Sequence, residues 1–208
     1  MYLNVAEIPQ RRYKYYGSSH PVMTSSNETQ QDIAGLFRKF ALFGISTIPK
    51  HFDRQVSRIE EICDIDGKVV MLELAPNYAE LVDKGILRPN TYMSIEERWK
   101  GRYSKIIAGD QELTIPENPD WLIALMCEGY LYPEWNREKI MRGNIVKEKP
   151  DIVIVGNGNS DMIKDHFPHA YYTVFEISGG YSASSTGHDR GIHQWNNPDK
   201  VIRLPSEY

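Results

Sequence analysis

Two apolar runs near the C-terminus, separated by an amphipathic stretch, predict a strand–helix–strand unit. The runs are 151–155 and 171–177, and each leads into a segment rich in glycine, serine and asparagine. The stretch 161–166 between them has helical spacing. Parallel strands joined by a helix end at the same edge of a sheet, which is where open α/β folds hold ligands. The pattern therefore predicts a site beyond the ends of the two strands.

Apolar spacing predicts further elements in the first part of the chain. A capping-box pattern of Ser25 and Glu28 predicts a helix that Gly44 would end. A second helix is expected to begin after Pro49, because the apolar residues that follow lie on one helical face. The mostly apolar run 68–74 then predicts a strand.

The middle of the chain has mostly helical patterns. Ser94 and Glu97 form another capping-box pattern, and apolar residues continue at helical spacing as far as Ile106. The Asn-Pro pair at 118–119 predicts a helix start, because Asn caps helices and Pro suits the first helical position. A polar helix is expected to end near Gly143.

Two short apolar stretches complete the predicted elements. Residues 113–115 and 201–204 are expected to be strands, the second at a sheet edge and ended by a proline. We therefore expect one domain over 1–208, of α/β or α+β class, with a C-terminal βαβ unit in a mixed sheet flanked by helices. As an alternative, 90–145 is a helical insertion or a cap over the sheet.

Composition narrows the class of protein. The chain has 208 residues and a formal net charge of −4, which disfavours nucleic-acid binding because that needs a basic face. No apolar run is long enough for a membrane span, and the N-terminus does not resemble a signal peptide. Cys63 and Cys127 are expected to be buried thiols in a reducing compartment, with a disulfide as the less favoured alternative. We therefore expect a cytoplasmic protein.

The segment 156–161 is the first candidate for ligand binding. Free backbone amides at a helix start favour an anion, and the side chains of Asn157, Asn159 and Ser160 would bind the same ligand. Neither nucleotide-binding glycine motif is present, however. In the alternative interpretation, Ser160 or Asn159 simply caps the helix.

The segment after residue 177 is the second candidate, because it combines hydroxyl groups with glycines. Such a segment can wrap a phosphate or a sugar, or can act as a lid; the alternative is a plain solvated loop. The proposed ligand-binding residues are Ser178, Gly180, Ser182, Ser184, Ser185 and Thr186.

Two carboxylates near strand ends are candidate catalytic groups. Glu176 lies among apolar neighbours close to the end of its strand, and desolvation there would raise its pKa toward values useful in acid–base chemistry. Glu73 lies in a similar position in the run 68–74. If the two strands were neighbours, both carboxylates could face one pocket. In the alternative, each carboxylate pairs with a basic side chain or points to solvent.

The segment 188–193 adds groups that could transfer protons or bind anions. His188 is a candidate proton-transfer residue, and Arg190 is a candidate clamp for an anionic group of the substrate. Metal binding is disfavoured because the spacing matches no common ligand pattern. Serine-hydrolase chemistry is also disfavoured, since no nucleophile-elbow motif is present. The alternative is that these are surface polar residues.

These features favour a small cytoplasmic α/β enzyme that acts on a phosphorylated or nucleotide-like small molecule by group transfer or hydrolysis. The sequence does not identify a cofactor. The competing class is a non-catalytic binding or assembly protein, such as a viral or accessory factor, which could form a homo-oligomer. Its support is a set of aromatic residues outside clear core positions: Tyr13, Tyr15, Tyr16, Tyr130, Tyr132, Trp135 and Trp195.

Overall fold

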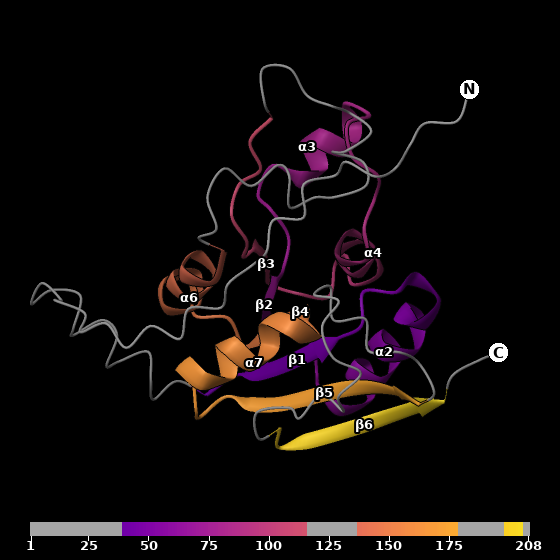
Figure 1. The fold of residues 1–208 in the computed structure, drawn as a ribbon, viewed down its shortest axis with the longest axis vertical. Helices are drawn as coiled ribbons and strands as arrows, with labels where there is room; N and C mark the ends of the chain where they lie inside the picture. The colour runs from indigo at the N-terminus through magenta and orange to yellow at the C-terminus, as the bar shows by residue number, and fades with distance from the viewer. Residues whose placement is uncertain (1–38, 116–136, 179–197, 206–208) are drawn as a thin grey trace, which may run out of the picture.

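The computed structural model describes residues 39–115, 137–178 and 198–205, which form six strands and five helices (Figure 1). The strands are β1 (Ala41–Ile45), β2 (Val69–Leu72), β3 (Lys105–Ala108), β4 (Ile152–Gly156), β5 (Tyr171–Ser178) and β6 (Lys200–Pro205). The helices are α2 (Pro49–Ile62), α3 (Tyr78–Asp83), α4 (Thr91–Arg98), α6 (Arg137–Glu148) and α7 (Asn157–His166). The described part of the chain is thus an α/β fold, as expected.

All six strands belong to one sheet, in the order β3-β2-β4-β1-β5-β6. Every pairing between them is parallel, so the sheet is parallel rather than mixed. Ala41 of β1 is in register with Ile152 of β4 on one side and with Tyr171 of β5 on the other. The two strands of the C-terminal unit therefore flank β1, and their carboxyl ends lie at the same edge of the sheet.

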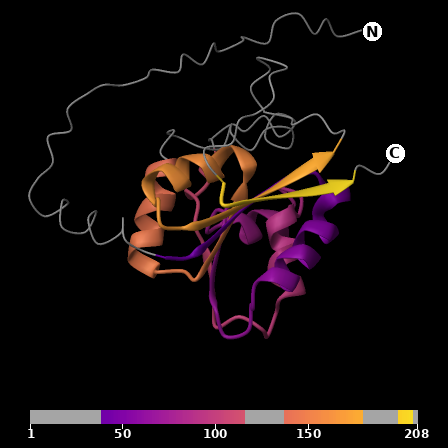
Figure 2. The ribbon, with the colours of Figure 1, turned by 90° about the horizontal axis from the view of Figure 1, so that it is seen from below.

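Helices cover both faces of the sheet, and each face has its own apolar core. Figure 2 shows α6 and α7, in orange, on one face and the indigo and purple helices on the other. Phe52, Val56 and Ile59 of α2 pack with Phe43 and Ile45 on the first face. On the second face the core includes residues of α6 and α7 such as Met141, Ile145 and Ile163. Strands covered on both faces read as continuous apolar runs, which accounts for the composition of β1 and β4.

The prediction of a helix from Ser25 to Gly44 is wrong at its C-terminal end, because Ala41–Ile45 is strand β1 in the interior of the sheet. A short continuous apolar run fits a buried strand or a buried helix equally well. Gly44 does not end a helix. A Cβ atom there would lie 2.6 Å from Oγ of Ser160, so the glycine allows α7 to pack closely on the strand.

The helix expected from Ser94 to Ile106 is also partly wrong. Its N-cap is Asn90, whose side chain accepts hydrogen bonds from two backbone N–H groups of the first turn. The helix ends at Arg98, and Ile106 belongs to strand β3. Residues 113–115, which were expected to be a strand, are not one.

Other predicted elements are confirmed. The helix after Pro49 and the edge strand over 201–204 are present as α2 and β6. The polar helix continues past Gly143 to Glu148. β3 lies within 90–145, so part of that stretch belongs to the sheet. The helix expected from 118–119 lies outside the described residues.

Candidate functional site

The candidate site lies at the carboxyl edge of the sheet, where β1 and β4 are neighbours. The chain leaves β1 into α2 on one face and leaves β4 into α7 on the other. Adjacent strands whose connections leave in opposite directions form the crevice in which open α/β folds bind ligands. Glu73 follows β2 directly, and Asp110 follows β3 at the same edge.

Glu73 is the centre of the polar groups at this edge. Its Oε1 accepts hydrogen bonds from Arg137 at 2.7 Å and from the side-chain amide of Asn159 at 2.6 Å. Its Oε2 accepts from the backbone N–H of Gly156 at 2.7 Å and from the hydroxyl of Tyr92 at 3.2 Å. The side chain is only 10% exposed. One carboxylate therefore connects β2 with β4, α4, α6 and α7.

Arg137 also binds a second buried carboxylate. Its Nε lies 3.0 Å from Oδ1 and 2.9 Å from Oδ2 of Asp110, and one terminal nitrogen contacts the same carboxylate. The Asp110 side chain is 1% exposed, whereas that of Arg137 is 22% exposed. The guanidinium group thus bridges Glu73 and Asp110 at a position where little water can screen the charges of the three groups.

Burial and charge act in opposite directions on Glu73. Burial raises the pKa of Glu73, while the charge of Arg137 and the hydrogen bond from Gly156 lower it. Burial, followed by the nearby carboxylate of Glu73, raises the pKa of Tyr92 well above its ordinary value. Perturbed acids in a crevice are typical of functional sites, although structural ion pairs perturb pKa values as well.

The predicted loop 156–161 is the first turn of α7, and Gly156 is its N-cap without a side-chain cap bond. The alternative in which Ser160 or Asn159 caps the helix is therefore wrong. Asn159 binds Glu73, and Asn157 donates to the carbonyl of Phe175 at 3.2 Å. All the polar side chains predicted here to bind a ligand already have partners within the fold.

Ser160 belongs to a buried hydroxyl pair. Its Oγ lies 2.6 Å from the hydroxyl of Tyr172 and 2.8 Å from the carbonyl of Asn157. The Tyr172 hydroxyl donates to Asp161 at 2.7 Å. Burial raises the pKa of Tyr172. Ser160 is fully buried, and its hydrogen bond with Tyr172 holds α7 against β5.

Glu176 lies apart from this site. Arg203 of β6 donates to its carboxylate at 2.8 Å, and the Glu176 side chain is 39% exposed. Strands β4 and β1 separate β5 from β2. The condition for a pocket shared by Glu176 and Glu73 is therefore not met. Glu176 instead matches the alternative in which it pairs with a basic side chain.

Most of the remaining predicted site residues lie outside the described residues. They are Gly180, Ser182, Ser184, Ser185, Thr186, His188 and Arg190. Ser178 is the last residue of β5. The segment that contains the others thus begins at the carboxyl edge of the sheet. Cys127 and the aromatic residues of the competing hypothesis are also outside the described part, whereas Cys63 is a half-buried free thiol.

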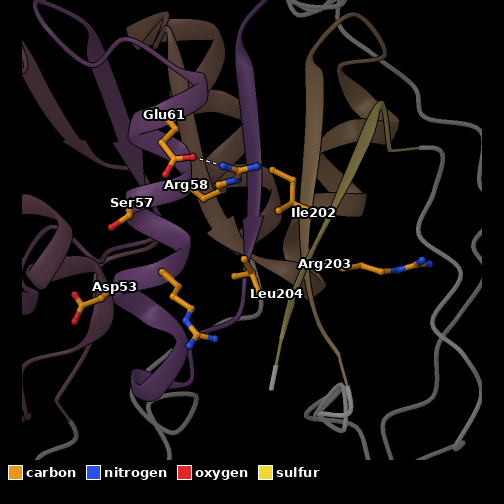
Figure 3. A pocket seen from close by; sticks show the side chains of 8 residues that line it. Asp53, Ser57, Arg58, Glu61, Ile202, Arg203 and Leu204 are labelled. Carbon is orange, nitrogen blue, oxygen red and sulfur yellow. Dashed lines mark hydrogen bonds and ion pairs between the residues drawn. The ribbon is translucent and has the colours of Figure 1, made fainter. Parts of the chain in front are cut away.

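A separate groove lies between α2 and β6, with a cavity volume of about 480 Å³ (Figure 3). Ile202 and Leu204 line it, together with charged residues of α2. Arg58 pairs with Glu61, and Arg203 points away from α2. Because these arginines are paired with carboxylates at the surface, we place the candidate site at the buried carboxylate of Glu73 rather than in this groove.

Sequence reasoning missed Asp110, Arg137 and Tyr92. Asp110 had a signal, because it follows an apolar run just as Glu73 does, but that run was assigned to a helix. Arg137 and Tyr92 had none, since each is an ordinary helical residue brought to the edge by the fold.

Comparisons of the chain with known protein families, with curated proteins and with solved structures found no match. Within the described ranges, no helix has the length and apolar character needed to cross a membrane. The same ranges contain no group of three or more His, Cys, Asp or Glu residues placed to hold a metal ion.

Proposed function

We propose that the protein is a small cytoplasmic α/β enzyme that acts on a phosphorylated or nucleotide-like small molecule by group transfer or hydrolysis. The observation that carries the proposal is the carboxylate of Glu73, which is 10% exposed at the carboxyl ends of β2 and β4 and is bonded to Arg137 and to the start of α7. A desolvated carboxylate at the ends of parallel strands is suited to proton transfer.

Glu73 acts as the acid–base residue in this proposal. Two of its four donors, Tyr92 and Asn159, are neutral side chains. Either bond can be exchanged for one to a substrate hydroxyl or to a water molecule while the ion pair with Arg137 stays intact. Burial raises the pKa of Glu73, which brings its proton affinity closer to neutral pH, where a general base is most effective.

The first turn of α7 is the second reason to propose an anionic ligand. Backbone N–H groups at a helix N-terminus favour phosphate, and Glu73 already uses that of Gly156. Apart from the backbone of α7 itself, no atom of the described residues lies within 4 Å of the position that a Cβ would take at Gly158, which leaves room for a ligand there. The serine- and glycine-rich segment predicted to wrap the ligand follows β5 from the same edge of the sheet.

Thermal unfolding with ATP, UDP-glucose, ribose phosphate and inorganic phosphate tests the proposal. A ligand at about a hundred times its dissociation constant stabilises the fold by roughly 3 kcal/mol. Phosphorus NMR of the stabilising compound should then show turnover, and Glu73→Gln should reduce the rate at least about 100-fold. The matched control is Glu80→Gln, because Glu80 is an exposed carboxylate of α3 paired with Lys84.

If none of these compounds stabilised the protein, the result would contradict the proposal. If the protein were then also a concentration-dependent oligomer, the non-catalytic assembly role would be favoured instead.

A further inference from the structure

Glu73 is bonded to Arg137 as well as to the start of α7, and Arg137 is bonded in turn to Asp110. Arg137 is at the start of α6, and one terminal nitrogen of its guanidinium group bonds both carboxylates, while its Nε bonds Asp110 alone. Both carboxylates are more buried than Arg137 itself. One positive charge thus faces two negative charges in a poorly hydrated position.

The two carboxylates compete for that positive charge. Asp110 holds Arg137 through both of its oxygens, whereas Glu73 has a single bond to it. The remaining partners of Glu73 are the uncharged Tyr92, Asn159 and Gly156 N–H. Within the described ranges, the charged and titratable groups that act on Glu73 are therefore Arg137, Asp110 and the Tyr92 hydroxyl.

We propose that Arg137 and Asp110 are positioning residues for Glu73: Arg137 holds the carboxylate in place, and Asp110 draws part of the guanidinium charge away from it. The catalytic meaning of this inference rests on the proposed function. Its physical content does not, because it concerns the proton affinity of a group in the free protein.

The arrangement has a chemical consequence. A carboxylate with a guanidinium group to itself would be held ionised and would be a weak base, since an opposite charge favours the charged form. Sharing the guanidinium with Asp110 lessens that effect and leaves Glu73 able to accept and return a proton. Arg137 still fixes the direction of the carboxylate toward α7.

NMR titration of the full chain, isotope-labelled at the glutamate carboxyls, tests the inference without any substrate. The resonance of Glu73 is identified by its loss in Glu73→Gln. Arg137→Gln should raise the measured pKa of Glu73 by about 1 or more. Asp110→Asn should lower it, because a like charge is removed and the guanidinium is left to Glu73. The resonance of Glu80, far from the pair, serves as the internal control.

Arg137→Lys provides the conservative variant. It keeps the positive charge but cannot bond to both carboxylates in the same geometry, so it should raise the pKa of Glu73 less than Arg137→Gln does. If Arg137→Gln does not fold, Arg137→Lys and Asp110→Asn decide the matter. A merely structural role would lower stability without moving the titration in opposite directions.

Two results would overturn the inference: an unchanged pKa of Glu73 in the folded variants, or shifts of the same sign in Arg137→Gln and Asp110→Asn. Absence of turnover with every phosphorylated compound, combined with the expected opposite shifts, would contradict the proposed function and leave the assignment of Arg137 and Asp110 standing.

Discussion

The backbone N–H of Gly156 donates a 2.7 Å hydrogen bond to Oε2 of Glu73. Gly156 is the N-cap residue of α7 and provides no side-chain cap, and its own backbone N–H is bonded to a carboxylate from the end of another strand. Negative charge at a helix N-terminus is stabilising. The group that we propose as the acid–base residue therefore also holds α7 in position.

Glu73→Gln should lower the free energy of unfolding by about 2 kcal/mol at neutral pH, because hydrogen bonds to charged groups contribute roughly 1.5–3 kcal/mol. The substitution keeps the shape of the side chain but removes the charge that faces Arg137. Urea denaturation measures the change. The exposed control Glu80→Gln should stay within about 0.5 kcal/mol of the parent. Equal stability of the two variants would show that the buried carboxylate does not hold the fold.

Glu60 gives a prediction about pH. Its carboxylate accepts hydrogen bonds from Arg98 and from the indole N–H of Trp99. The hydrogen bond from Arg98 is the main cause that lowers the pKa of Glu60 below its ordinary value of 4.5. The ionised group therefore stabilises the folded state above about pH 4.5, and this contribution is lost as the pH falls through the lowered folded-state pKa.

Unfolding of the parent and of Glu60→Gln at several pH values measures this effect. The parent should be more stable by about 1 kcal/mol at neutral pH, and the difference should shrink toward zero in acid. A difference that grows as the pH falls would contradict the assignment.

Thr173 is a buried residue whose hydroxyl has no hydrogen-bond partner in the described ranges. Thr173→Val should leave stability unchanged or raise it by about 1 kcal/mol, because an unpaired buried hydroxyl costs free energy. The neighbouring Val174→Thr is the matched control: it introduces a hydroxyl at a fully buried position and should be destabilising. Thermal unfolding measures both, and a clear loss of stability in Thr173→Val would contradict the assignment of an unpaired hydroxyl.

Gly44 and Gly158 should respond to alanine in opposite ways. A Cβ at Gly44 would lie 2.6 Å from Oγ of Ser160 and 2.9 Å from Oδ1 of Asn157, so Gly44→Ala should cost about 1–3 kcal/mol through overpacking. Gly158 lies within α7 with open space around it, so Gly158→Ala should stabilise the helix by about 0.5–1 kcal/mol. The two denaturation midpoints should move to opposite sides of the parent, and a loss of stability in Gly158→Ala would contradict this packing.

Elements with strong local signals could be predicted from the sequence. The proline at the start of α2 and its apolar stripe specify a helix wherever it packs. The runs that became β4 and β5 are long, apolar and separated by polar residues. That their carboxyl ends lie at the same edge of the sheet followed from the helical connection between them, and this indicated the region of the candidate site.

Elements that depend on tertiary contacts could not be predicted. The run at Ala41–Ile45 is a strand because β4 and β5 pair with it on both sides, which no local pattern reveals. Once β3 was taken as part of a helix, Asp110 lost its place at a strand end. The interactions of Arg137 with Glu73 span a large separation in the chain and arise only when α6 packs on the sheet.

Amide NMR spectra of the protein, recorded with the compound that stabilises it most in the screen, test the location of the site most directly. The largest shifts are expected on the first turn of α7, at Gly158 and Asn159. The amides of Ser57 and Arg58, in the groove between α2 and β6, should stay in place. Shifts confined to that groove, with the first turn of α7 unchanged, would contradict a ligand site at the carboxyl edge beside Glu73.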